Sequence, residues 1–323
     1  MMRSFRSWAG ALLLGVAAVS GVARAQAFPD HFVKLVVPFA PGGATDVLGR
    51  ILGKRMGEIL GQSIVVENHP GAGGTVGTEF VARQPADGYT LLLVNAIPHT
   101  ASKPLYPGLK YDPVQGFTPI GALGYNRYIL VVGADSPAKD YASFVKLLKA
   151  EPGKQNFASA GMGSAPHLAM ELWLRAAGVD LVHVPYQGSG PAMTDLVGGR
   201  VQAAMDNVAA MPLIKAGKLR ALAITGSKRA AALPDVPTFA EVGLPEFDVI
   251  GTWGLVAPAG VPADRVAILS DALAKAVQDP VVRDALVAQG IDPDPGSAAQ
   301  YGATLVRESD KWTKLIDAAK IKL

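Results

Sequence analysis

Cysteine is absent from the 323-residue chain. Its absence excludes disulfide bridges, thiolate nucleophiles, zinc sites built from cysteine, and a lipid anchor on an N-terminal cysteine. Charge is also sparse, since Asp, Glu, Lys and Arg make up 18% of the residues, and aromatic residues make up 7%. The sequence has no cluster of basic residues interleaved with aromatics, which argues against a nucleic-acid-binding surface.

The N-terminal segment has the pattern of a secretory signal peptide. Arg3 and Arg6 supply a basic start, and residues 9–19 form an apolar run that is short for a membrane span. Residues 23–25, Ala-Arg-Ala, match an A-x-A cleavage site. We therefore expect a signal peptide over residues 1–25 and an exported protein.

Removal of this segment changes the charge balance. A second A-x-A, Ala25-Gln26-Ala27, would instead start the mature chain at Phe28. In either case three arginines and no acid are lost, so 30 Lys and Arg against 27 Asp and Glu become 27 against 27. About 300 residues remain, enough for two domains of ordinary size.

The most informative stretch runs from Pro38 to Leu48, Pro-Phe-Ala-Pro-Gly-Gly-Ala-Thr-Asp-Val-Leu. An apolar strand, Phe32 to Val37, precedes it, and apolar residues at helical spacing follow it as far as Leu60. This order aims the free N–H groups and the positive dipole end of a helix at whatever lies above the strand. Gly42 and Gly43 let a ligand approach the backbone closely.

This first Gly-rich loop predicts a cradle for a small anion, most simply a carboxylate. Thr45 or Asp46 is placed to cap the helix. The loop lacks the Lys-Ser/Thr ending of a phosphate-binding P-loop and does not fit the G-x-G-x-x-G dinucleotide pattern. A tight strand-to-helix turn would explain the two glycines about as well as a ligand site would.

The rest of the chain repeats strand, Gly-rich loop and helix, with two such units in each half. We expect further strands at 63–68, 89–95, 128–132, 156–159, 181–186, 201–205, 219–225 and 249–255. We expect helices at 76–83, 141–148, 165–176, 191–198, 209–216, 263–277, 280–289 and 298–319, the last with Ser297 as N-cap.

Two segments are predicted to depart from this pattern. Residues 96–119 are rich in Pro and Gly and predict an irregular excursion, and the C-terminal helices are predicted to have no strands of their own. These helices are expected to pack on the first half. We therefore predict an α/β protein with a discontinuous first lobe, 28–126 and 251–323, and a second lobe, 127–250, which face each other across a cleft.

Catalytic patterns are weak. Ser164 and His167 stand three residues apart on a helix and could form a nucleophile and its base, but Ser164 as the N-cap is the simpler interpretation. Asp46 and Asp206 could form a carboxylate pair, although nothing in the sequence fixes their separation. No G-x-S-x-G elbow is present, and the five histidines show no metal-ligand spacing. We expect a binding protein with no catalytic residue, cofactor or metal; an exported α/β hydrolase is the alternative.

Over its whole mature length the chain resembles the substrate-binding proteins of tripartite tricarboxylate transporters, the TctC-like or Bug periplasmic solute receptors known from Bordetella. The matching stretches are Val37 to Asp46, Glu67 to Gly74, Ser159 to Ser164 with His167 and Leu168, Val184 to Pro191 with Asp195 and Leu196, and Gly251 to Leu255 with Ala257 to Gly260. Five such stretches in family order are a specific signal.

The resemblance implies a type II periplasmic binding protein fold, in which two lobes of mixed, mostly parallel sheet close over a ligand. It implies a small carboxylate ligand, such as a di- or tricarboxylate, an acidic amino acid or an aromatic acid. It also implies a periplasmic location and delivery to membrane permease subunits, with a two-component sensor as the alternative partner. We expect a monomer that binds no nucleic acid.

The resemblance also assigns the site. Backbone N–H groups and ordered water in the loop Phe39 to Thr45 would hold one carboxylate, and the second lobe would add the loops Ser159 to Ser164 and Tyr186 to Ser189. Asp206 would sense a ligand ammonium or hydroxyl, or else cap the next helix. The predicted ligand-binding residues are Phe39, Ala40, Gly42, Gly43, Thr45, Asp46, Ser159, Gly163, Ser164, His167, Tyr186, Gly188 and Asp206. His69 and Thr252 depart from the family pattern and are candidates for setting specificity.

Overall fold

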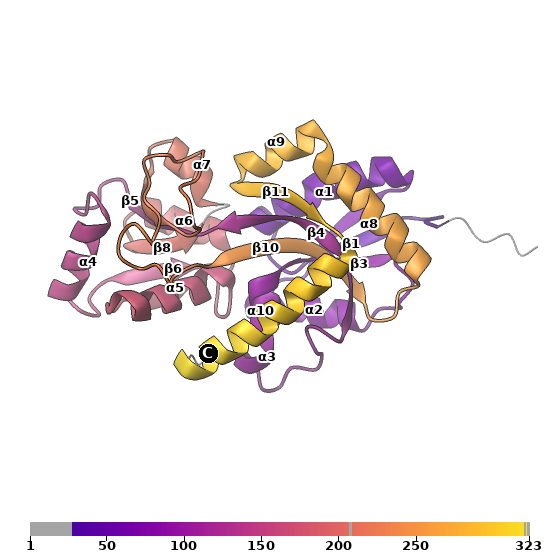
Figure 1. The fold of residues 1–323 in the computed structure, drawn as a ribbon, viewed down its shortest axis with the longest axis horizontal. Helices are drawn as coiled ribbons and strands as arrows, with labels where there is room; N and C mark the ends of the chain where they lie inside the picture. The colour runs from indigo at the N-terminus through magenta and orange to yellow at the C-terminus, as the bar shows by residue number, and fades with distance from the viewer. Residues whose placement is uncertain (1–27, 207–208, 320, 322–323) are drawn as a thin grey trace, which may run out of the picture.

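The computed structural model describes residues 28–206, 209–319 and 321. The predicted signal peptide lies outside the described residues. The strands form two sheets, each at the centre of one lobe (Figure 1). Within the described ranges, no helix combines the length and the apolar character that a membrane crossing requires.

The first lobe is built on a six-stranded sheet. Its strands are β1 (Val33–Val37), β2 (Ile64–Asn68), β3 (Thr90–Asn95), β4 (Phe117–Arg127), β10 (Ile250–Pro258) and β11 (Ile291–Gly296). They lie in the order β11-β4-β10-β3-β1-β2. β1 pairs in parallel with β2 and β3, whereas β10 and β11 pair antiparallel with their neighbours.

The second lobe is built on a five-stranded sheet. Its strands are β5 (Ile129–Gly133), β6 (Asn156–Ser159), β7 (Val182–Pro185), β8 (Ala203–Asp206) and β9 (Leu219–Ile224). They lie in the order β7-β6-β8-β5-β9, with β6 parallel to its two neighbours and β5 antiparallel to its own. Each sheet therefore combines a parallel part with antiparallel strands.

Helices cover both sheets (Figure 1). In the first lobe they are α1 (Ala44–Leu60), the 3-10 turn η1 (Ala72–Gly74), α2 (Thr75–Ala82), α3 (Ala96–Leu105), α8 (Ala263–Gln278), α9 (Pro280–Ala288) and α10 (Ala298–Ala319). In the second they are α4 (Tyr141–Ala150), α5 (Ala165–Ala177), α6 (Ser189–Val197) and α7 (Ala210–Lys215).

The chain passes from the first sheet to the second at Tyr128, between the end of β4 and the start of β5. It returns between the end of β9 and the start of β10. The C-terminal helix α10 packs on α3 and β4, as expected for the first lobe. Its buried Trp312 and Ile316 also share a hydrophobic cluster with Phe157 and Trp173 of the second lobe. One buried apolar cluster therefore includes residues of both lobes.

The prediction of an irregular segment over residues 96–119 was wrong for its first part, which is α3. The Asn95 side chain caps this helix by accepting the Ile97 N–H at 3.0 Å, and Ile97, Ala101 and Leu105 are buried at a spacing of four residues. Pro98 stands in the first turn, where its missing N–H has no intrahelical acceptor. Proline therefore did not signal a break here.

Two smaller expectations were also wrong. The C-terminal helices are interrupted by β11, an edge strand whose prolines are tolerated because one side of an edge strand makes no ladder hydrogen bonds. Helix α1 begins at Ala44 with Gly43 as its N-cap, and no described side chain caps it. Thr45 and Asp46 lie inside the first turn, two and three residues after the N-cap position, and so do not cap the helix.

Candidate functional site

A cavity of about 60 Å³ lies between the two lobes. This is several times the space of roughly 10–15 Å³ that one water molecule needs by the same measure. Its walls are mainly apolar. They are formed by Phe39, Ala40, Gly43, Thr45, Asn95, Pro98, Asn126, Tyr128, Ala160, Ser164, Ala165, Pro166, Gly188, Ser189, Asp206 and Trp253.

Two open grooves flank this central cavity and share lining residues with it. One groove, of about 420 Å³, runs between the glycine-rich residues 70–74 of the first lobe and residues 160–162 of the second. It shares Phe39 and Ala40 with the central cavity. The other groove, of about 450 Å³, lies between the first turn of α1 and helix α6.

The predicted site residues divide into those at the cleft and those behind it. Phe39, Ala40, Gly43, Thr45, Ser164, Gly188 and Asp206 line the central cavity. Gly42 and Tyr186 line one flanking groove each. The remaining four, Asp46, Ser159, Gly163 and His167, line none of these spaces. The structure therefore brings nine of the predicted residues, from distant parts of the chain, to the cleft. The other four lie behind the surfaces that line it.

Asp46 fixes the first Gly-rich loop. One of its carboxylate oxygens accepts the Gly42 N–H at 2.9 Å, and the other accepts the Asn68 side-chain amide at 3.0 Å. Arg50 contacts both oxygens, at 3.0 and 2.9 Å. Asn68 also donates to the Phe39 carbonyl. Burial raises the pKa of Asp46, but the hydrogen bonds from Arg50, Gly42 and Asn68 outweigh it and hold that pKa below its ordinary value.

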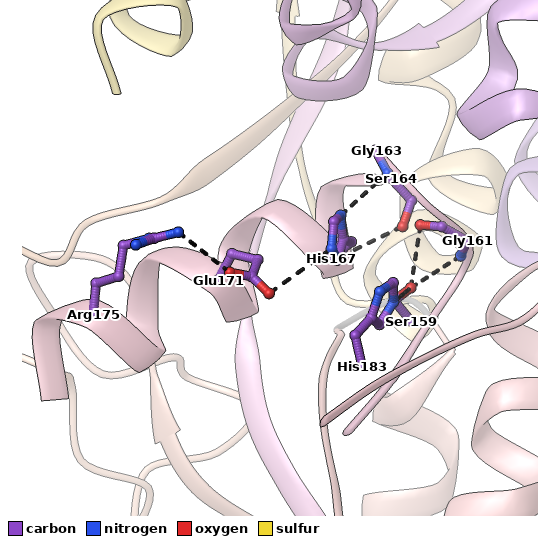
Figure 2. Close-up of polar contacts among 8 residues, drawn as sticks. All are labelled: Ser159, Gly161, Gly163, Ser164, His167, Glu171, Arg175 and His183. Atoms are coloured by element: carbon purple, nitrogen blue, oxygen red, sulfur yellow. Dashed lines mark hydrogen bonds and ion pairs between the residues drawn. The ribbon is translucent and has the colours of Figure 1, made fainter. Parts of the chain in front are cut away.

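Two histidines support the loop Ser159 to Ser164 from behind (Figure 2). The Ser159 Oγ lies 2.6 Å from Nε2 of His183 and accepts the Gly161 N–H at 3.1 Å. The rings of His167 and His183 stack with centroids 4.1 Å apart. Burial lowers the pKa of His167 to about 4, and burial together with the neighbouring His167 lowers that of His183 to about 3. Both rings are therefore neutral at pH 7.

Ser164 and His167 do not form a nucleophile and its base. The Ser164 side chain accepts the backbone N–H of His167 and so caps α5, as the simpler interpretation predicted. The His167 imidazole faces elsewhere, with Nδ1 accepting the Gly163 N–H at 3.1 Å (Figure 2). On the other side of the ring, Nε2 lies 3.9 Å from Glu171, which pairs in turn with Arg175. Nδ1 of His167 already accepts the Gly163 N–H and so does not act as a base towards the Ser164 hydroxyl.

Asp206 supplies a buried carboxylate at the cavity wall, at the end of β8. It accepts a hydrogen bond of 2.5 Å from the Ser189 hydroxyl and one of 3.2 Å from the Ala209 N–H. Ala209 is the N-cap residue of α7, so Asp206 also contacts the start of the next helix. Asp206 is the one charged residue among the described residues that line the central cavity.

Several residues of the central cavity were not predicted from the sequence, chiefly Asn95, Asn126, Tyr128 and Trp253, whereas Ser189 belongs to the predicted loop Tyr186 to Ser189. Asn95 ends β3 and could have been found by the rule used for the other loops, that ligands gather at the carboxyl ends of strands. Trp253 lies within a stretch that carried the family resemblance. Asn126 and Tyr128 carried no signal, because the crossing between sheets has no motif.

The two residues that depart from the family pattern lie outside these spaces. His69 stacks on Phe80, with ring centroids 4.2 Å apart, and Nε2 lies 3.4 Å from Glu67. Thr252 is half-buried on β10 beside Trp253. Neither contributes to the central cavity or its flanking grooves. In the described part of the chain, no group of three or more His, Cys, Asp or Glu side chains is arranged to hold a metal ion.

Comparison with known proteins gives a consistent result. The family model described as "Tripartite tricarboxylate transporter family receptor" matches residues 48–321. The structure of periplasmic binding protein BugD is 34% identical, with a TM-score of 0.87 over 92% of this chain and 100% of that one.

Two further solved structures contain ligands. MatC (Rpa3494) from Rhodopseudomonas palustris, with bound malate, is 36% identical with a TM-score of 0.85, over 90% of this chain and 100% of that one. R. palustris Rpa4515, with adipate, is 34% identical with a TM-score of 0.87, over 92% of this chain and 100% of that one. These relatives are solute-binding proteins rather than enzymes. The chain belongs to the tripartite tricarboxylate transporter family of receptors, has their two-lobed α/β fold and is likewise a binding protein.

Proposed function

We propose that this protein is a periplasmic receptor that captures a small carboxylate in the central cavity and delivers it to the permease of a tripartite tricarboxylate transporter. The two lobes, 28–126 with 251–323 and 127–250, act as the closing halves. Export depends on a signal peptide over residues 1–25, and the receptor works as a monomer.

One observation carries the carboxylate assignment: four helices begin at the central cavity. Gly43 and Thr45 open α1, Asn95 precedes α3, Ser164 precedes α5 and Gly188 precedes α6, and all line the same space. Each helix N-terminus carries unpaired N–H groups and about half a positive charge. Four of them around one cavity make a site for an anion.

The way the helices are capped supports the same assignment. Both α1 and α6 have glycine at the N-cap and, among the described residues, no side-chain cap hydrogen bond, so backbone N–H groups of their first turns are available to a ligand. No lysine or arginine of the described ranges lines the central cavity. The attraction for an anion therefore comes from oriented backbone dipoles, which suits a compact group such as a carboxylate.

Relatives with bound malate and adipate favour a dicarboxylate among the possible acids. An acidic amino acid or an aromatic acid is also compatible with the mainly apolar walls and with Phe39 and Trp253 at the cavity. Asp206 favours a ligand that brings a hydrogen-bond donor to this wall, since a carboxylate accepts and does not donate.

The proposal is tested by native mass spectrometry of gently purified protein, followed by thermal-shift screening against di- and tricarboxylates, acidic amino acids and aromatic acids. A ligand at about 100 times its dissociation constant stabilises the folded state by roughly 2.7 kcal/mol, which is a readily visible shift. A co-purified acid, or one acid that raises the midpoint, is the expected result. No bound species and no shift across the panel would contradict the carboxylate assignment.

A further inference from the structure

Two segments of the chain join the lobes, and they run side by side. The first leaves β4 and enters β5 through Tyr128, and the second enters β10 through Val249. β4 and β10 pair antiparallel with Arg127 opposite Ile250, so Tyr128 and Val249 are the next facing positions, just beyond the ladder. A rotation of one lobe against the other has to bend the chain at or next to these positions, because β4, β5 and β10 are held in their sheets.

Thr225 joins both segments through one hydroxyl. It directly follows β9 and is 0% exposed. Its Oγ1 lies 2.8 Å from the Tyr128 nitrogen and 2.7 Å from the Val249 carbonyl oxygen. A backbone N–H only donates and a carbonyl only accepts, so the hydroxyl accepts from Tyr128 and donates to Val249. One buried side chain therefore bridges the donor of the first segment and the acceptor of the second.

The sheet of the second lobe explains why Thr225 lies at this point. β5 and β9 pair antiparallel with Ile129 opposite Ile224, so the next residue, Thr225, comes to lie beside Tyr128. The Thr225 N–H also donates to the Tyr128 carbonyl at 2.9 Å. Tyr128 thus makes both of its backbone hydrogen bonds with Thr225, and the same residue links it to Val249.

Further contacts surround this bridge, but they lie at the surface. Arg127 donates to the Lys228 carbonyl of the second lobe at 3.2 Å, and its guanidinium lies 3.5 Å from the Asp292 carboxylate of the first. The Gly226 N–H donates to the Asp248 carboxylate at 2.9 Å. Water competes for exposed groups of this kind, whereas a buried N–H or carbonyl that loses its partner is left unsatisfied. Loss of the Thr225 hydroxyl should therefore affect the two crossing segments most.

The same two segments also form part of the ligand site. Asn126 and Tyr128 of the first segment line the central cavity, and so does Trp253, four residues after Val249 on β10. The walls of the cavity are therefore continuous with the positions that bend when the lobes move. A change in the freedom of these positions should alter how readily the cavity closes.

We propose that Thr225 is a hinge residue whose hydroxyl keeps Tyr128 and Val249 together, so that the two crossing segments bend as one unit and the lobes follow a single path between open and closed states. This inference rests on the proposed function, in which the lobes close over an acid. Without the hydroxyl the two segments bend separately, and the unliganded protein samples more arrangements of its lobes. Ordering these arrangements on binding then reduces affinity.

The arrangement of the lobes is measured by the distance between two spin labels on the full mature protein. The chain has no cysteine, so Lys54→Cys on α1 and Lys149→Cys on α4 supply one exposed attachment site in each lobe (Figure 1). Pulsed electron paramagnetic resonance of this labelled parent, without ligand, should give one narrow distance distribution. Thr225→Val keeps the shape of the side chain but removes the hydroxyl, and it should broaden the distribution. Thr225→Ala, which adds no methyl group, should broaden it as well.

Affinity gives a second measurement. Calorimetry with the acid that stabilises the protein most should show binding to Thr225→Val weakened by about threefold or more, because a smaller fraction of the unliganded protein is ready to close. Thr225→Ser keeps the hydroxyl and should retain the narrow distribution and most of the affinity. Thr238→Val is the matched control, because Thr238 is also buried in the second lobe and its hydroxyl accepts the Glu241 N–H at 3.2 Å. This control should keep the distribution of the parent.

A Thr225→Val variant with the distribution and the affinity of the parent would overturn the role of Thr225 in the hinge. Equal broadening in Thr225→Val and Thr238→Val, or in Thr225→Val and Thr225→Ser, would overturn it as well, since neither result depends on the bridging hydroxyl. Failure of every acid to bind the parent would instead contradict the proposed function. The unliganded distributions would still decide whether Thr225 restrains the lobes.

Discussion

The backbone N–H of Gly163 donates to Nδ1 of His167 across 3.1 Å, and this bond ties a loop of the cleft to the first turn of α5. An imidazole can accept at Nδ1 only while that nitrogen is unprotonated. Burial of the ring, which is 3% exposed, has the same effect on the charge state. The folded protein therefore depends on a neutral histidine directly behind the candidate site.

Stability should fall in mild acid. Burial lowers the pKa of His167 from 6.5 to about 4. Between these two pH values the imidazole is therefore protonated in the unfolded chain and neutral in the folded one, which favours unfolding. The contribution is complete above about pH 6.5, decreases as the pH falls towards 4, and amounts to about 3 kcal/mol in total. Urea denaturation at a series of pH values between 7.5 and 4 measures it.

His167→Gln removes this titration and should make the dependence on pH shallower. It should not abolish it, because burial also lowers the pKa of His99 to about 4. Leu168→Val is the control, since it changes a buried side chain of α5 that does not titrate, and it should leave the slope unchanged. A His167→Gln variant with the wild-type slope would show that the ring is not kept neutral by the fold.

Contact between the lobes at Gly73 should control closure. Gly73 in η1 has a φ of +64°, and a Cβ there would lie 2.5 Å from the Met162 carbonyl of the opposite lobe. Tyr106 of the first lobe donates to the same carbonyl at 3.3 Å. Gly73→Ala should hold the lobes apart and weaken ligand affinity by about tenfold or more, measured by calorimetry.

The control for this effect is Gly61→Ala. Gly61 has a similar φ of +69°, but a Cβ there would meet no atom of the described residues within 4 Å. Both variants carry the backbone cost of a left-handed alanine, about 1–2 kcal/mol of stability, but only Gly73→Ala meets the other lobe. Equal ligand affinities for the two variants would contradict a role of Gly73 in closure.

Asp46 should contribute to both stability and ligand affinity without touching the ligand. Asp46→Ala leaves the Gly42 N–H and Arg50 Nε without this acceptor and leaves the Asn68 amide with the Phe39 carbonyl alone, at an expected cost of about 1–3 kcal/mol in the free energy of unfolding. Affinity should fall as well, because these bonds hold the loop that opens α1. Urea denaturation and calorimetry measure the two effects.

Glu58→Ala is the comparison for Asp46→Ala. Glu58 pairs with Arg55 on the surface, with its side chain 48% exposed, so its loss should change stability by less than about 0.5 kcal/mol and leave affinity unchanged. If the two variants behaved alike, the hydrogen bonds of Asp46 would not be organising the loop.

Local signals in the sequence predicted the elements that present the site. The cap at Ser164 and the order of strand, Gly-rich loop and helix depend only on residues that are neighbours in the sequence. The structure confirms both predictions. By contrast, α3 was missed because its prolines occupy the first and last turns, where a helix tolerates them. Propensity alone does not distinguish those positions from a helix interior.

Contacts between residues that are distant in the sequence could not be predicted from the sequence alone. The spacing of Asp46 and Arg50 indicates a helical ion pair, but the bond to Asn68 exists only because β2 lies beside β1. Likewise, Asn95, Asn126 and Gly251 meet at Tyr128 from separate segments of the chain. Convergence of this kind is set by the sheet order, which no local pattern specifies.

Calorimetry of the wild type and Ala160→Trp, with the acid that stabilises the protein most, shows whether a carboxylate binds in the cavity between the lobes. Ala160 lines the central cavity and one flanking groove, so an indole there fills the space. We expect one bound acid per wild-type chain and an affinity at least about a hundredfold weaker in a folded Ala160→Trp variant. Equal affinities for the two proteins would show that the acid binds outside the central cavity.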